Sequence, residues 1–168
     1  MSGGIGDVSS NAKGSGARYN SGKVAYELLP LRLLLDWLGK IGMSGEPDSH
    51  AYEVLLHIAR WQASDDSGLD DAIAATVGAG GFEAFADAAR VFEYGKHKYA
   101  AWNWAKGMPW SVPLGCIVRH ALALLRGEQT DPESGVSHLG HIQCNLIMLK
   151  LYAETYPEGD DRPKGWLG

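Results

Sequence analysis

Two predicted helices that flank a short polar turn constrain the fold of this chain more than any other stretch. The first helix is expected to begin with Ser111 as its cap and Pro113 in its first turn, where proline loses no useful hydrogen bond, and to end at Gly127. The second is expected to begin within residues 131–137. Both carry an apolar stripe with helical spacing, which predicts that they share one core. The stripes consist of Leu114, Ile117, Val118, Ala121, Leu122 and Leu125 in the first helix and Leu139, Ile142, Leu146, Leu149 and Ala153 in the second.

Polar side chains with metal-binding chemistry concentrate in the same span. His138, His141 and Asn145 fall together on one face of the second helix, and His120 lies on the first. Imidazole nitrogens and carboxylate oxygens suit Mn, Co, Ni or Zn, whereas Mg prefers oxygen ligands alone. A functional polar site is therefore predicted; in the structural alternative, the carboxylates cap a helix or face solvent and the histidines bond to backbone. The carboxylates in the turn are Glu128, Asp131 and Glu133.

Composition limits the class of protein. A length of 168 residues with 45% hydrophobic and 21% charged residues predicts one globular domain. The net charge of −5 argues against a general nucleic-acid binder, so no direct nucleic-acid contact is expected. Cys116 and Cys144 lie inside predicted helices, as buried thiols do in a reducing compartment, which favours the cytoplasm. We expect no membrane contact and no secretion, since no apolar run reaches spanning length and no signal-peptide pattern is present.

The rest of the chain predicts an all-α fold, because no alternating strand pattern and no repeat is found. Residues 1–16 are rich in Gly, Ser and Asn and predict a flexible N-terminal arm. A single helical domain is expected over residues 17–156, followed by a Pro- and Gly-rich tail over residues 157–168. Further helices are predicted at residues 31–38, 51–62, 69–77 and 82–94.

Cations and aromatic residues interleave in two segments that precede the predicted helix pair. This mixture suits a nucleotide pocket, in which cations hold phosphates, rings pack on the base and an amide reads its edge. The dipeptide at residues 22–23 is not a Walker phosphate loop, because the earlier glycine and the following Ser or Thr are missing. In the structural alternative, the first segment is a surface turn and the tryptophans anchor a loop. The candidates are Arg18, Tyr19, Asn20 and Lys23 in the first segment and Lys96, Lys98, Tyr99, Asn103 and Trp104 in the second.

Four ordered motifs resemble those of a known family. They are Arg-Tyr-Asn-Ser-Gly-Lys at residues 18–23, Leu-Leu-Pro at 28–30, the Phe-Glu-Tyr-Gly-Lys-His-Lys-Tyr run with Asn-Trp at 92–104, and the Arg-His, Gly-Glu, Asp-Pro-Glu-Ser-Gly, His-Leu-Gly-His and Asn series at 119–145. The chain resembles the phage-associated dATP/dGTP diphosphohydrolases, relatives of the all-α, MazG-like nucleoside triphosphate pyrophosphohydrolases. The resemblance covers residues 17–30 and 82–152 and leaves 39–81 as a probable helical insertion. It departs from the MazG-like pattern of paired carboxylates on helices, since His138 and His141 stand in the second helix instead.

The resemblance implies metal-dependent hydrolysis of a purine deoxynucleoside triphosphate to monophosphate and pyrophosphate. The expected setting is the cytoplasm of a phage-infected bacterium, where the enzyme would shape the nucleotide pool as a homo-oligomer. Mg, Mn or Co would be held by some of His120, Glu128, Asp131, Glu133, His138 and His141, with Glu128 or Glu133 accepting a proton. The expected nucleotide-binding residues are Arg18, Tyr19, Asn20, Lys23, Lys96, Lys98, Tyr99, Asn103, Trp104 and Asn145, of which Asn103 and a nearby ring would read the base.

Two other functions fit the same residues. A nucleotide-binding module without turnover would capture a nucleotide or a nucleotide-derived signal, and it would keep its ligand intact after metal chelation. A purely structural protein would use its histidines to cap helices and would show no rise in melting temperature with nucleotides.

Overall fold

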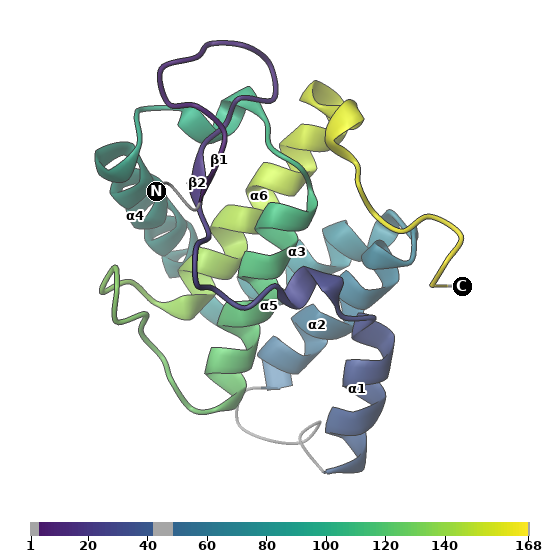
Figure 1. Cartoon of the computed structure of the whole chain (residues 1–168). Helices are drawn as coiled ribbons and strands as arrows, with labels where there is room; N and C mark the ends of the chain where they lie inside the picture. The colour runs from purple at the N-terminus through teal and green to yellow at the C-terminus, as the bar shows by residue number, and fades with distance from the viewer. Residues whose placement is uncertain (1–3, 42–48, 168) are drawn as a thin grey trace.

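The computed structural model describes residues 4–41 and 49–167. Their main elements are six α-helices, as the all-α expectation requires (Figure 1). The helices are α1 (Leu31–Lys40), α2 (Ser49–Gln62), α3 (Ser67–Gly80), α4 (Glu83–Lys98), α5 (Ser111–Leu125) and α6 (His138–Thr155). Short 3₁₀ helices η1 (Tyr26–Leu28), η3 (Asn103–Lys106) and η4 (Pro157–Gly159) lie between or after them.

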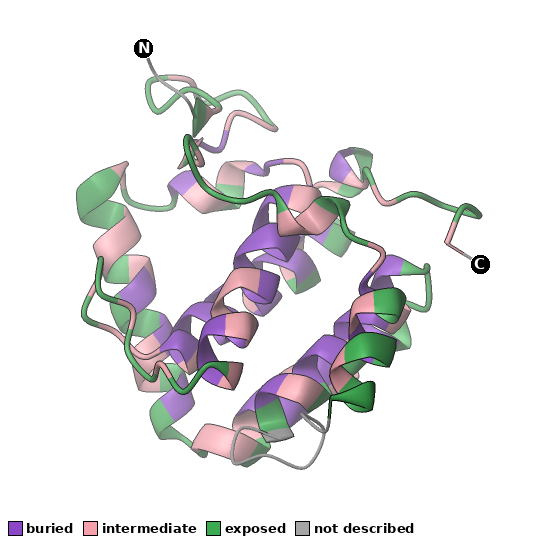
Figure 2. Ribbon diagram, turned by 60° about the horizontal axis from the view of Figure 1, so that its bottom comes forward, coloured by how far each residue is buried: buried purple, intermediate pink, exposed green. Residues whose placement is uncertain are grey.

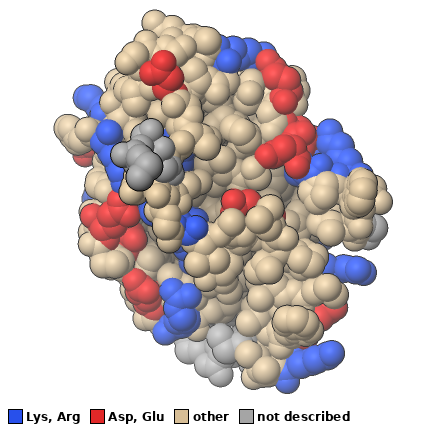
Figure 3. Space-filling view, in the orientation of Figure 1, with Lys and Arg blue, Asp and Glu red and all other residues tan. Residues whose placement is uncertain are grey.

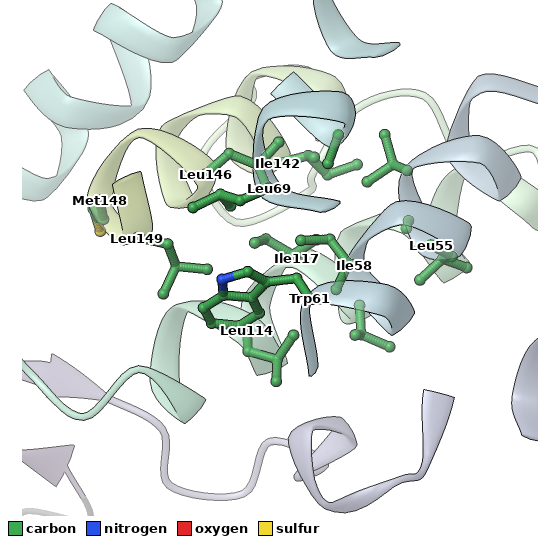
Figure 4. Packing of buried hydrophobic residues seen from close by; sticks show 14 of the residues in the cluster. Leu55, Ile58, Trp61, Leu69, Leu114, Ile117, Ile142, Leu146, Met148 and Leu149 are labelled. Carbon is green, nitrogen blue, oxygen red and sulfur yellow. The ribbon is translucent and has the colours of Figure 1, made fainter. Parts of the chain in front are cut away.

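The two helices of the predicted pair form the centre of the domain. α6 packs against α5 and α4 and also contacts α3, while α2 contacts α5 and α3. Buried residues gather toward the middle of the domain (Figure 2), and Ile117 of α5 and Ile142 and Leu149 of α6 are fully buried. Figure 4 shows this core around Trp61 of α2, which is 1% exposed. Residues 49–80, within the segment interpreted as an insertion, thus contribute to the same core.

The N-cap of α6 lies at the end of the range predicted for the start of this helix, whereas the N-cap of α5 is not the predicted residue. Ser137 caps α6, because its Oγ accepts a hydrogen bond from the Gly140 N–H at 3.1 Å. Ser111 is not the cap of α5 but its first helical residue. Its N–H and Oγ both donate to the Asp161 carboxylate, at 2.8 and 2.5 Å, so a carboxylate fifty residues further along the chain satisfies this helix end.

Helices α3 and α4 extend beyond their predicted ends. α3 continues through Gly78 to Gly80, and α4 continues one turn past Tyr94 to Lys98. The last turn of α4 contains basic residues, which interact favourably with the partial negative charge at a helix C-terminus. This favourable charge offsets the weak helix preference of Gly95.

Residues 4–16, predicted as a flexible arm, contact the segment around η3. The Gly14 and Gly16 N–H groups donate to the Lys106 and Gly107 carbonyls, at 2.6 and 2.8 Å. Two-residue strands β1 (Gly4–Ile5) and β2 (Arg18–Tyr19) pair in antiparallel fashion, and strands this short leave no alternating pattern in the sequence. The segment after β2 crosses α5 to reach α1 (Figure 1), which places residues 18–28 beside the histidine-bearing helices.

The C-terminal segment, predicted as a tail, packs against α2 and α5. Arg162 stacks over the rings of Trp61 and Trp110, with centroids 4.5 and 5.2 Å from the guanidinium carbon. Its Nη1 also donates to the Trp61 carbonyl at 2.8 Å, and its side chain is 6% exposed. None of the helices in the described ranges is long and apolar enough to cross a membrane.

Candidate functional site

A pocket of about 340 Å³ lies between the N-terminal segment, the end of α4 and the two central helices. This volume falls within the range of small-molecule sites. On the face shown in Figure 3, basic and acidic side chains are interspersed and form no continuous basic surface. Most residues proposed from the sequence meet in this pocket although they come from four separate segments. They are Arg18, Tyr19, Asn20, Lys23, Lys98, Tyr99, Asn103, Trp104, His120, Asp131, Glu133, His141 and Asn145.

Three proposed residues do not line the pocket, for two different reasons. Lys96 is exposed to solvent. Because α4 continues to Lys98, residues two apart project about 200° from each other, and only Lys98 faces the pocket. Lys96 therefore points away from this pocket, and its assignment to the nucleotide stays a prediction. Glu128 and His138 lie instead behind His120, where they form part of the histidine cluster.

The packing of α5 on α6 brings the three histidines together. The Nδ1 atoms of His120 and His138 are 2.8 Å apart, and the rings of His120 and His141 are stacked with centroids 4.3 Å apart. One ligand atom each from His120, Asp131 and His138 lie within 4.8 Å of one another, a set that could hold a metal ion. The shared face predicted for His138 and His141 is thus present, with His120 opposite.

The protonation states of His120 and His141 suit metal binding. Burial, together with the neighbouring histidines, lowers the pKa of His120 to about 2. Burial also lowers the pKa of His141 to about 4, against the attraction of Asp131. Both imidazoles are neutral at pH 7, and the neutral ring is the form that ligates metals.

The donor set fits a divalent transition metal. His138 Nε2 is buried without a hydrogen-bond partner in the described residues, and it lies 3.5 Å from Glu128 Oε1. Two imidazoles and one carboxylate suit Mn, Co or Zn. Three protein ligands also leave coordination positions for water or a phosphate oxygen, as in catalytic metal sites.

The loop between the central helices holds Asp131 in place. The Asp131 carboxylate accepts hydrogen bonds from the Ser134 N–H at 2.9 Å and from its Oγ at 2.8 Å. The same hydroxyl lies 2.7 Å from His141 Nε2, so one serine links the carboxylate to the cluster. Ser134 was not identified from the sequence, although it stands in the Asp-Pro-Glu-Ser-Gly motif, because a lone serine in a turn carries no distinctive signal.

Glu133 lies among cations rather than among the histidines. Its carboxylate accepts from Lys98 at 2.5 Å, from the Tyr94 hydroxyl at 3.0 Å and from Lys23 at 3.3 Å. The hydrogen bond from Lys98 outweighs burial and lowers the pKa of Glu133 to about 2. Lys98 in turn lies 5.8 Å from the ring centroid of Tyr19. The mouth of the pocket therefore holds two lysines that share a single carboxylate, which leaves one positive charge uncompensated.

Two arginines extend the basic lining toward the histidines. Arg18 Nη2 donates to Asn145 Oδ1 at 2.5 Å, and Asn145 Nδ2 donates to the His141 carbonyl at 2.8 Å. Arg119 lines the same pocket from the position directly before His120. Arg119 received no role in the sequence analysis; its place in the Arg-His motif was the one signal that could have identified it.

Asn103 has a structural role that differs from the predicted reading of a base. Its Oδ1 accepts from the Ala17 N–H at 3.0 Å, and its Nδ2 donates to the Ala17 carbonyl at 2.8 Å. Asn103 is 3% exposed, so this amide is committed to the backbone next to β2. It thereby fixes the position of Arg18 at the pocket.

Replacing Asn103 by alanine is expected to lower the free energy of unfolding by about 2 kcal/mol, because two buried backbone groups of Ala17 lose their partners. Asn103→Asp keeps the acceptor but sets a buried carboxylate oxygen against the Ala17 carbonyl, so its loss should be at least as large. Thermal melting of the three proteins measures the effect. The ratio of the affinities for dATP and dGTP should stay constant. A changed ratio would show that Asn103 takes part in base recognition.

The fold and the pocket define an all-α domain in which a basic pocket lining adjoins a candidate metal centre. Residues 81–162, about half of the chain, match the family described as dATP/dGTP diphosphohydrolase, N-terminal. A protein of Salmonella phage PMBT28 named dATP/dGTP diphosphohydrolase is 32% identical over 76 residues, which are 45% of this chain and 26% of the relative. Over this region the resemblance to the dATP/dGTP diphosphohydrolase family that the motifs indicated is confirmed.

The matched region has a clear structural extent. It runs from the start of α4 past η4 and contains the whole histidine and carboxylate cluster, while Arg18 and Lys23 lie outside it. The chain spans about a quarter of the length of the phage relative. No solved structure matches the chain.

Proposed function

We propose that this domain hydrolyses a purine deoxynucleoside triphosphate to the monophosphate and pyrophosphate. The observation that supports this most directly is one pocket that places Arg18, Lys23 and Lys98 beside the cluster of His120 and Asp131. A triphosphate chain needs several cations along its length and a charged centre at the reacting phosphorus. The printed name of the phage relative supports the same reaction.

His120, Asp131 and His138 are the proposed metal-binding residues. A bound divalent ion would neutralise phosphate charge and lower the pKa of a water molecule. Two imidazole ligands favour Mn or Co over Mg, which prefers oxygen. Glu128, beside His138 Nε2, is proposed to orient that ring, as carboxylates commonly do for metal-binding histidines.

Glu133 is the proposed proton acceptor, with its activity coupled to substrate binding. The triphosphate would compete with this carboxylate for its ion-pair partners Lys23 and Lys98. Loss of these partners would raise the pKa of Glu133 from about 2 toward that of a free glutamate, so that it could accept a proton from the attacking water. Tyr19, Tyr99 and Trp104 line the remaining pocket wall and are proposed to pack on the base.

Product analysis by chromatography tests the reaction. Each deoxynucleoside triphosphate is mixed with the protein in the presence of Mg, Mn or Co, and again with chelator. We expect a purine triphosphate to yield monophosphate and pyrophosphate with Mn or Co, and to remain intact with chelator. Return of every nucleotide intact under all conditions would contradict hydrolysis and favour the nucleotide-binding module.

Two expectations about the setting of the protein stay predictions. The cytoplasm of an infected bacterium is proposed as its location, and a homo-oligomer as its assembled form. α1 and its C-cap residue Ile41 present exposed apolar side chains at successive spacings of four residues, a surface on which a second copy could pack. The other two are Leu33 and Trp37.

A further inference from the structure

We propose that Arg119 binds a phosphoryl oxygen of the substrate and that, with Arg18, it forms the inner anion site of the pocket. The inference rests on the proposed function. It adds one phosphate-binding residue and the order in which the basic groups of the pocket bind a phosphoryl group. Arg119 lies on α5 directly before His120, and both residues line the pocket.

The hydrogen bonds of Arg119 leave much of its guanidinium free. Its Nη2 donates to the Val24 carbonyl at 3.2 Å, and its Nη1 lies 3.6 Å from the weak acceptor Cys116 Sγ. Its Nε is buried and has no hydrogen-bond partner in the described residues. Because a guanidinium carries five N–H donors, most of them remain available to a ligand with several oxygens.

Arg18 shows the same lack of a counter-charge. Its Nη2 donates to the neutral Asn145 and Met148 side chains, and its Nε is buried without a partner in the described residues. Across the described ranges, neither Arg18 nor Arg119 forms an ion pair with a carboxylate. Burial and the other two histidines lower the pKa of His120 most, and the positive charges of Arg119 and Arg18 lower it further. This agrees with the position of both arginines beside the histidine cluster.

The lysines at the pocket mouth differ from the arginines in this respect. Lys23 and Lys98 already share the carboxylate of Glu133 as an ion-pair partner, so an incoming anion must compete with that carboxylate for them. At Arg18 and Arg119 there is no carboxylate to displace, and a partly buried charge without a counter-ion gains most from an anion. The arginines are therefore the first site for a phosphoryl group, which is thereby held next to His120 and Asp131.

Calorimetric titration with inorganic pyrophosphate in the presence of chelator tests this site without metal or turnover. Arg119→Ala is expected to weaken pyrophosphate binding about tenfold to a hundredfold, as the loss of charged hydrogen bonds does. Arg119→Lys should bind pyrophosphate with an affinity between those of Arg119→Ala and the unaltered protein, because lysine keeps the charge and loses the planar guanidinium. Arg32→Ala, at an exposed position on α1 outside the pocket, is the charge-matched control and should bind normally.

A second titration with a purine deoxynucleoside separates phosphate binding from support of the loop through Val24. Arg119→Ala should leave nucleoside affinity unchanged, whereas an equal loss for nucleoside and pyrophosphate would assign Arg119 a structural role and overturn the proposal. Absence of pyrophosphate binding by the unaltered protein, or equal binding by Arg119→Ala, would also overturn it. The product analysis decides the reaction itself independently, since these titrations involve no turnover.

Discussion

Replacing Asp131 by asparagine is expected to reduce diphosphohydrolase turnover by about a hundredfold or more. The carboxylate supplies the negative charge of the proposed ligand set with His120 and His138, and asparagine removes that charge while keeping its size. An amide oxygen can still accept from the Ser134 N–H, so the turn that holds residue 131 should persist. Initial rates measured across a series of Mn or Co concentrations report the change.

The matched control for this substitution is Asp70→Asn. Asp70 pairs with Lys150 at 2.7 Å on the surface, with its side chain 61% exposed, and it lies outside the pocket. The control should keep full turnover, and both variants should melt close to the unaltered protein. Metal content measured after dialysis should fall for Asp131→Asn alone. If Asp131→Asn keeps more than half of the normal turnover with an unchanged metal dependence, Asp131 is not a metal ligand.

The site was predictable where its residues share one helix face. His138, His141 and Asn145 follow helical spacing, and Ser137 provides the cap that fixes where the helix begins. Their meeting with His120 follows from two apolar stripes that pack on each other. Local spacing therefore predicted both the central fold and the cluster.

The role of Asn103 could not be read from the sequence, because its partner Ala17 is 86 residues away. A buried asparagine that pairs with backbone looks the same in sequence as one that reads a base. Lys96 lies outside the pocket for a local reason, because α4 continues to Lys98 past the end predicted at residue 94. The direction of its side chain depends on that helix end.

Replacing Arg162 by alanine is expected to lower the free energy of unfolding by about 3 kcal/mol, near the low end for a broken buried ion pair. The side chains of Arg162 and Asp160 are 6% and 8% exposed, and the guanidinium binds the Asp160 carboxylate through Nε and Nη2, each at 2.9 Å. Removal leaves that carboxylate with Lys164 and uncovers Trp61 and Trp110. The melting temperature should fall by roughly 6–12 °C, as expected for a domain of this size.

Two matched variants separate the parts of this effect. Arg162→Lys keeps the charge but loses the planar group that stacks on both tryptophans, so it should recover part of the stability. Arg126→Ala removes a more exposed arginine, whose side chain is 60% exposed and pairs with Glu128 at 3.6 Å, and it should change stability by less than about 1 kcal/mol. Equal melting temperatures for Arg162→Ala and Arg126→Ala would contradict the packing role of the C-terminal segment.

The same ion pair predicts how stability depends on pH. Burial acts to raise the pKa of Asp160, but hydrogen bonds from Arg162 and Lys164 outweigh it and hold the pKa at about 2, below its usual value of 3.8. A carboxyl group with a lowered pKa stabilises the fold above the unfolded pKa, and this contribution is lost as the pH falls toward 2. The stability difference between the unaltered protein and Arg162→Ala should therefore be constant from pH 5 to 7 and shrink from pH 4 to 2. Urea unfolding at each pH measures it, and a difference that grows on acidification would show that Asp160 is not the group that Arg162 stabilises.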